Sequence, residues 1–195
     1  MPPRSPHTRR AAHKVRIIGG RWKRWQIPVA DRPGLRPTPD RVRETLFNWL
    51  ADELSGARCL DLYAGTGALG LEALSRGASS VHFVEQDRQT AAELRNQLNK
   101  LQCADAHVET ADVLHWLRTP PRQTFHAVFM DPPYHSDCLG EACALLVQAG
   151  WLAPAAWIYL EFAADEAAPT LPVGWRVHRD THAGQVRAWL CQAGD

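Results

Sequence analysis

The sequence has 195 residues, of which 45% are hydrophobic and 22% are charged, and its formal net charge is +1. This length suits one domain with a full core. No apolar run reaches the roughly eighteen residues of a membrane span, and the basic first twenty residues lack the apolar centre of a secretory signal, so we expect neither.

Five cysteines occur without a C-x-x-C pair and mostly within apolar segments. They are Cys59, Cys103, Cys138, Cys143 and Cys191. We expect buried, reduced thiols rather than a zinc site or a disulfide framework, which favours a cytoplasmic protein. The nine histidines show no metal-ligand spacing, so no metal is expected.

Positive charge is concentrated at the start of the chain. Residues 1–43 carry 12 Lys and Arg against 2 acidic residues, whereas residues 44–195 carry 10 against 19. This basic arm (residues 1–43) on an otherwise acidic body (residues 44–195) favours a polyanionic partner, most simply nucleic acid. A disordered tail kept for solubility is the alternative, and it would explain residues 1–14 but not residues 15–43.

A β-hairpin is predicted over residues 15–28, with two short runs on either side of Gly19-Gly20. Basic and aromatic side chains alternate in it, so that Arg and Lys can bind phosphates while Trp stacks on an exposed base. Alternatively the tryptophans anchor the hairpin on the body, and we expect at least one to do so. The candidate nucleic-acid-binding residues of the hairpin are Arg16, Arg21, Trp22, Lys23 and Arg24.

Residues 36–40, Arg-Pro-Thr-Pro-Asp, predict an extended entry to a helix that runs to about Leu54. Thr38 is the expected N-cap and Pro39 the first helical residue. Apolar residues at helical spacing give this helix one buried face. Near its start, Arg36, Thr38 and Arg41 are expected at a ligand-facing edge, with the two arginines as further nucleic-acid-binding candidates.

Residues 59–74 predict a strand, a glycine turn and a helix. Gly65 and Gly67 let the main chain approach a ligand, and the helix points free N–H groups at it. The turn also fits the dinucleotide fingerprint, so a nicotinamide enzyme stays open, as does a turn that only packs the helix on the strand. Asp61, expected at the mouth of the turn, would repel a pyrophosphate and attract a cationic amino-acid group such as that of S-adenosylmethionine.

Two further strands are predicted to end near acidic residues. The strand within residues 79–87 ends on Glu85, twenty residues past Gly65, where an acid receives ribose hydroxyls in nucleotide-binding α/β units. The strand over residues 107–110 leads to Asp112, which can accept a hydrogen bond from an adenine amino group.

The strand over residues 125–130 leads into Asp131-Pro132-Pro133-Tyr134. Two prolines fix a stiff turn that can present the Asp131 carboxylate and the Pro132 carbonyl as acceptors, with Tyr134 as a flat wall. Two acceptors and an aromatic face suit the planar amino group of a base. The alternative is a rigid loop that only closes the strand.

Strands and helices alternate through residue 161, and residues 175–190 add a closing hairpin. This order predicts an α/β fold, with a mostly parallel, doubly wound sheet, an antiparallel last strand and helices on both faces.

Four features of the sequence together resemble a Rossmann-like, class I S-adenosylmethionine-dependent methyltransferase of the amino-methylating kind. They are Asp-Leu-Tyr-Ala-Gly-Thr-Gly at 61–67, Glu85, Asp112 and Asp-Pro-Pro-Tyr at 131–134.

With residues 16–20 and 36–44 included, the sequence resembles the bacterial 16S ribosomal RNA guanine-N2 methyltransferases, the RsmD family. The resemblance covers nearly all of residues 15–192. It departs from the pattern in a longer, more basic segment before residue 15 and in Tyr63, which stands where phenylalanine is often found.

The resemblance implies a seven-stranded sheet. It also implies that the chain divides into a basic tail (1–14), an RNA-facing extension (15–54) and a methyltransferase domain (55–195). It implies that Asp131 and Pro132 receive the guanine N2 amine, with Tyr134 stacked on the base. The implied cofactor-binding residues are Thr38, Asp61, Tyr63, Gly65, Gly67, Glu85, Asp112 and Asp131.

The implied partner is 16S rRNA or the assembling small ribosomal subunit, with no membrane and with a monomeric protein. Three other functions stay open. They are methylation of DNA adenine or a protein glutamine amide, an inactive RNA-binding module, and a nicotinamide dehydrogenase.

Overall fold

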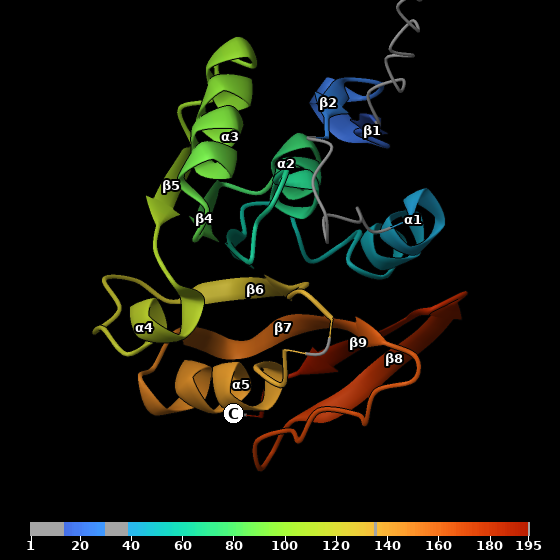
Figure 1. Cartoon of the computed structure of the whole chain (residues 1–195), viewed down its shortest axis with the longest axis vertical. Coiled ribbons are helices and arrows are strands. Elements are labelled where there is room, and N and C mark those ends of the chain that lie inside the picture. Colours follow the sequence, from blue (N-terminus) through green and yellow to red (C-terminus); the bar gives the residue numbers. More distant parts are fainter. Residues whose placement is uncertain (1–13, 30–38, 135, 195) are drawn as a thin grey trace, which may run out of the picture.

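The computed structural model describes residues 14–29, 39–134 and 136–194 (Figure 1). Its strands are β1 (Lys14–Arg16), β2 (Gln26–Pro28), β3 (Arg58–Leu62), β4 (Ser80–Glu85), β5 (Ala106–Thr110), β6 (Phe125–Met130), β7 (Leu152–Ala163), β8 (Arg176–Ala183) and β9 (Val186–Gln192). Strands β3 to β9 form one seven-stranded sheet in the order β5-β4-β3-β6-β7-β9-β8. Neighbours from β5 to β7 are parallel, and β9 runs against β7 and β8. The predicted fold class is confirmed.

Helices cover both faces of this sheet (Figure 1). They are α1 (Asp40–Trp49), α2 (Ala68–Ser75), α3 (Arg88–Lys100), α4 (Val113–Leu117) and α5 (Leu139–Gln148). Strand side chains alternate between two buried clusters because a strand repeats every two residues. Phe83 and Phe129 join the cluster under α1, α2 and α3, whereas Val84 and Val128 join the one under α4 and α5. Among the described residues no helix is long and apolar enough to span a membrane.

The N-terminal hairpin is confirmed, although its boundaries differ from the prediction. Lys14, placed in the tail from the sequence, begins β1, and the second strand begins at Gln26 rather than Arg21. The connection contains a short 3-10 helix, η1 (Gly20–Trp22). Ser75 of α2 holds this connection, because its hydroxyl donates to Gly19 O at 2.5 Å and accepts from Trp22 N at 2.9 Å. The basic and aromatic residues from Arg21 onward therefore lie on a turn and not on a strand.

Glu72 of α2 fixes the hairpin to the body. Its side chain is wholly buried, and it accepts hydrogen bonds from the backbone N–H groups of Ile18 at 2.7 Å and Gly19 at 2.8 Å. The Arg76 guanidinium donates to the same carboxylate at 2.7 Å. Apolar residues of the hairpin also join the cluster under α1, α2 and α3. The extension therefore shares a core with the sheet, while the proposed domain boundaries stay a prediction.

Helix α1 is shorter than predicted. It begins at Asp40 instead of Pro39, and it ends at Trp49 instead of Leu54. Pro39 occupies the N-cap position, and its side chain makes no capping hydrogen bond. The expected cap Thr38 and the RNA candidate Arg36 lie outside the described residues.

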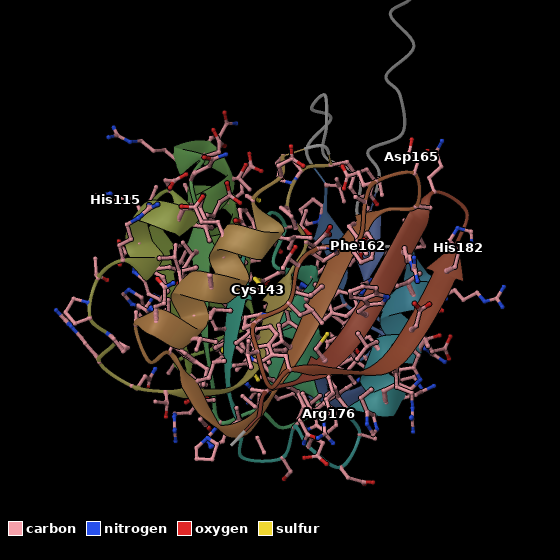
Figure 2. The ribbon with its side chains drawn as sticks, turned by 90° about the horizontal axis from the view of Figure 1, so that it is seen from below. His115, Cys143, Phe162, Asp165, Arg176 and His182 are labelled. Atoms are coloured by element: carbon pink, nitrogen blue, oxygen red, sulfur yellow. The ribbon has the colours of Figure 1, made fainter. Side chains whose placement is uncertain are left out.

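All five cysteines are free thiols, as predicted. Cys59, Cys143 and Cys191 are buried, and burial raises the pKa of each to about 12. Figure 2 shows Cys143 on α5, which packs on the sheet. Cys103 and Cys138 are only half-buried, so the expectation of burial is wrong for them.

We predict that Glu72→Gln lowers the free energy of unfolding by about 2–4 kcal/mol, because an amide cannot satisfy two backbone donors and the Arg76 cation together. Urea denaturation of the full chain measures this change. Glu44→Gln, at an exposed position of α1, is the matched control and should change stability by less than about 0.5 kcal/mol. Equal stabilities of the two variants would contradict the anchoring role.

Candidate active site

The turn after β3 contains Tyr63, whose backbone is strained, and two glycines, Gly65 and Gly67, that are required for different reasons. Tyr63 takes a φ of 61°, which is unusual for an aromatic residue. Gly67 has a φ of 74°, and a Cβ there would lie 2.4 Å from Leu94 Cδ1, so packing requires glycine. Gly65 has a φ of 53°, but a Cβ on it would meet nothing nearer than Tyr63 O at 3.8 Å. Gly65 therefore presents its backbone to open space, where a ligand can approach.

Asp61 lies behind this turn and not at its mouth, which corrects the sequence prediction. Its side chain is buried, and Oδ2 accepts the Gly70 N–H at 2.8 Å. Burial, reinforced by the charge of Glu85, raises the pKa of Asp61 to about 8 despite the opposing hydrogen bond. A carboxyl that is largely neutral at pH 7 gives little repulsion to a pyrophosphate, so that argument against a dinucleotide fails. A direct contact of Asp61 with a cofactor stays a prediction.

Glu85 ties the ends of β3 and β4 together. It is buried, and its two oxygens accept the N–H groups of Gly65 and Asp87, each at 2.8 Å. A carboxylate has about four acceptor positions, so Glu85 can still receive the hydroxyl of a ligand. Asp112 follows β5 and is exposed, and it caps α4 by accepting the His115 N–H at 2.8 Å. Both acids thus lie where parallel strands end, the usual ligand edge of an open α/β sheet.

The register of the sheet places the turn with Asp131-Pro132-Pro133-Tyr134 beside the glycine turn. Strands β3 and β6 are parallel neighbours, and Leu62 pairs with Met130. The next residues, Tyr63 and Asp131, therefore begin adjacent loops about 5 Å apart in strand spacing. Asp131 is half-buried at this edge. The fold brings the expected donor and acceptor parts of the site together.

Glu161 is a residue of this region that sequence reasoning left out of the site. It lies on β7 and is buried, and it accepts the Tyr159 hydroxyl at 2.7 Å and the Tyr134 hydroxyl at 3.3 Å. Burial and the charges of Glu161 and Asp131 raise the pKa of Tyr159 well above its ordinary value. The available signal was an acid near the end of an apolar strand, but nothing in the sequence shows that it faces Tyr134.

A cleft of ≈ 230 Å³ opens beside Tyr134. Its lining includes Pro132, Pro133, Glu161 and Phe162. A lining that combines prolines, aromatic rings and a carboxylate suits a flat, polar-edged group.

The candidate RNA-binding residues of the hairpin differ in how far their side chains are available. Both Trp22 and the neighbouring Trp25 are half-buried and pack against the core, so both anchor the hairpin. The Arg21 guanidinium lies 4.0 Å from the centre of the Trp22 ring, which takes part of the surface that a base would use. Lys23 and Arg24 are exposed.

Two other candidates flank the start of α1. Arg16 is exposed and pairs with Asp40 at 3.1 Å, and Arg41 is exposed on the first turn of the helix. An ion pair between exposed groups is weak, so Arg16 can exchange Asp40 for a phosphate.

The fold and these strand ends define the Rossmann-like class of methyltransferases. A solved structure titled as a putative methyltransferase, yhhF, from Escherichia coli superimposes with a TM-score of 0.87 at 42% identity, over 93% of this chain and 99% of that one. The family described as "Conserved hypothetical protein 95" matches residues 15–192, and the chain belongs to this family. The family resemblance noted in the sequence is thereby confirmed.

Curated relatives agree with this assignment. Ribosomal RNA small subunit methyltransferase D of Escherichia coli K12 is 47% identical over 180 residues, which cover 92% of this chain and 90% of the relative. The protein of the same name from Haemophilus influenzae is 42% identical over 188 residues, covering 95% and 97%.

Asp61 should make stability depend on pH. Its folded-state pKa of about 8 exceeds the ordinary 3.8, so between these values the folded protein holds a proton that the unfolded chain has lost. The free energy of unfolding therefore falls by up to about 1.4 kcal/mol per pH unit as the pH rises. Below pH 6.5 the lowered pKa of half-buried His82, about 4, gives the opposite slope, so the effect is clearest from pH 6.5 to 8.

Asp61→Asn keeps an acceptor for the Gly70 N–H and removes the ionisation. The stability of the variant relative to the original protein should rise by about 2 kcal/mol between pH 6.5 and 8. Urea denaturation at several pH values measures this difference. A difference that stays constant over the range would show that Asp61 is already ionised.

Proposed function

We propose that the protein is an S-adenosylmethionine-dependent methyltransferase that methylates the N2 amine of a guanine in small-subunit 16S ribosomal RNA. The observation that carries the proposal is the adjacency of the glycine turn after β3 and the Asp131 turn after β6. The names of the relatives, which are rRNA small subunit methyltransferases, support the substrate.

The residues at the carboxyl edge fit the cofactor. Gly65 offers an open backbone approach, Glu85 retains acceptor capacity for ribose hydroxyls, and exposed Asp112 can accept from the adenine amine. When bound, S-adenosylmethionine supplies an electrophilic methyl group on a sulfonium. Tyr63 begins the glycine turn, beside the turn that begins at Asp131, and Thr38 stays a candidate outside the described residues.

Asp131, Pro132 and Tyr134 would receive the guanine. The exocyclic amine is a weak nucleophile because its lone pair is delocalised into the ring. The Asp131 carboxylate and the Pro132 carbonyl would orient this amine by accepting its hydrogens, and the carboxylate would stabilise the positive charge that grows on nitrogen. The Tyr134 ring would stack on the base. Asp131 therefore acts by position and charge, without having to be a strong base.

The basic arm would hold the RNA. The target base must leave its stack, which costs a few kcal/mol, less in an open loop. Phosphate contacts from exposed residues such as Lys23, Arg24 and Arg41 would offset that cost. Such contacts suit 16S rRNA or an assembling small subunit in the cytoplasm, and we expect a monomer to suffice.

Asp131→Ala should reduce methyl transfer at least about 100-fold, because the amine loses its charged acceptor, while S-adenosylmethionine binding stays largely intact. Transfer of a labelled methyl group to undermethylated small subunits measures the first effect, and calorimetric titration measures the second. Asp52→Asn, at an exposed turn position, is the control and should leave both unchanged. Near-normal turnover by the Asp131 variant would refute the assignment of the loop.

The same assay with a labelled methyl group distinguishes this function from the three alternatives. We expect incorporation into small-subunit RNA and none into DNA or protein. Incorporation into DNA or protein alone would assign a different acceptor. RNA binding without any affinity for S-adenosylmethionine would indicate an inactive binding module, and tight binding of NAD in its place would indicate a dehydrogenase.

Glu161 should act as a positioning residue for Tyr134. Glu161→Gln leaves one good acceptor for two phenols, and the longer bond to Tyr134 should be the one lost. We predict that kcat falls about tenfold while the affinity for S-adenosylmethionine is unchanged. Tyr134→Phe, which removes only the hydroxyl, should cause a similar fall. Full activity in both variants would show that the hydrogen bond does not orient the ring.

A further inference from the structure

Two histidines and a glutamate converge on neighbouring strands away from the active site. His82 of β4 pairs in register with His107 of β5, and Glu109 follows two residues later on the same face as His107. One ligand atom from each of the three side chains lies within 4.8 Å of the others. His82 and His107 lie three residues, about 10 Å, before Glu85 and Thr110 at the ligand edge of these strands, and Glu109 lies one residue before Thr110. The two histidines are therefore set back from the cofactor region.

The distances within the cluster suit a shared ion better than direct hydrogen bonding. His107 Nε2 and Glu109 Oε2 are 3.6 Å apart, beyond hydrogen-bond range. Two ligands of one tetrahedral zinc ion, each about 2.0–2.1 Å from the metal, are roughly 3.4 Å apart. The rings of His82 and His107 have centroids 4.6 Å apart, so small side-chain rotations can bring their nitrogens to such an ion.

His82 brings an independent sign of a missing partner. Its Nε2 is buried, and no hydrogen-bond partner for it exists within the described part of the chain. Nearly all buried polar atoms in proteins have a partner, and this imidazole nitrogen, which lies beside two other ligand groups, is available to bind an ion. Trp116 of α4 packs on the His82 ring, with centroids 5.0 Å apart, and holds its orientation.

We propose that His82, His107 and Glu109 bind a divalent transition metal, with zinc as the best fit to two imidazoles and one carboxylate. The fourth position would hold water. The ion would cross-link β4 to β5, the edge strand of the sheet. Sequence spacing could not reveal this site, because its ligands come from two strands that only the sheet register brings together.

Calorimetric titration of the full chain, prepared without a histidine tag, with Zn²⁺ at pH 7 tests the proposal. One equivalent should bind with a Kd in the micromolar range or tighter. His107→Ala and Glu109→Gln, both at positions that are not buried, should each weaken binding at least tenfold. His115→Ala is the matched control, since His115 is an exposed histidine of α4 at the edge of the molecule in Figure 2, and its binding should be unchanged.

A second measurement uses the neighbouring ring as a reporter. Co²⁺ bound at the cluster should quench part of the protein's tryptophan fluorescence, Trp116→Phe should reduce this quenching, and His107→Ala should abolish it. Absence of zinc binding would overturn the proposal. Binding that is equally tight in the His107 and Glu109 variants would also overturn it, because other histidines or the free thiols would then be the ligands.

Discussion

Buried acidic side chains that accept backbone N–H groups hold this structure in the form that its site requires. Asp61, in its neutral form, accepts from Gly70, and Glu85 accepts from Gly65 and from the loop after β4. Glu72 does the same for the hairpin. A buried polar group is costly without partners, so none of these loops can move without leaving an acidic side chain exposed or without its hydrogen bonds. The glycine turn is therefore fixed before any ligand arrives, which lowers the cost of binding.

The order of the strands places the two parts of the site side by side. Strand β3 lies between β4 and β6. The loop after β3 therefore has Glu85, which can receive a nucleoside hydroxyl, on one side and the Asp131 turn on the other. Glu161 extends the arrangement by one more strand, since it reaches Tyr134 from β7. A methyl donor bound at the ends of β3 and β4 and a planar amine bound at the ends of β6 and β7 would then meet at Asp131, where the loop after β6 begins. The hairpin, fastened by Glu72, adds exposed cations beside this body.

The sequence predicted the features that depend on local patterns. Strand and helix periodicity identified the sheet, the glycines identified the turn after β3, and the two prolines of Asp-Pro-Pro-Tyr identified the turn that follows β6. Features that depend on packing were missed or misplaced. From the sequence, Asp61 was expected to contact a ligand at the mouth of the glycine turn, but its side chain is buried behind the turn. Glu161 faces Tyr134 only because β7 lies beside β6. The hairpin boundaries shifted for a similar reason, because Ser75 of a distant helix shapes the connection.

The central claim is that the amine of a guanine meets the methyl donor at the Asp131 loop. Its most direct measurement is nucleoside mass spectrometry of 16S rRNA, after reaction of the protein and S-adenosylmethionine with small subunits that lack the modification. The account predicts a single additional methyl group per RNA, recovered as N2-methylguanosine. A methyl group recovered on adenine, on a ring nitrogen of guanine or on ribose would contradict it.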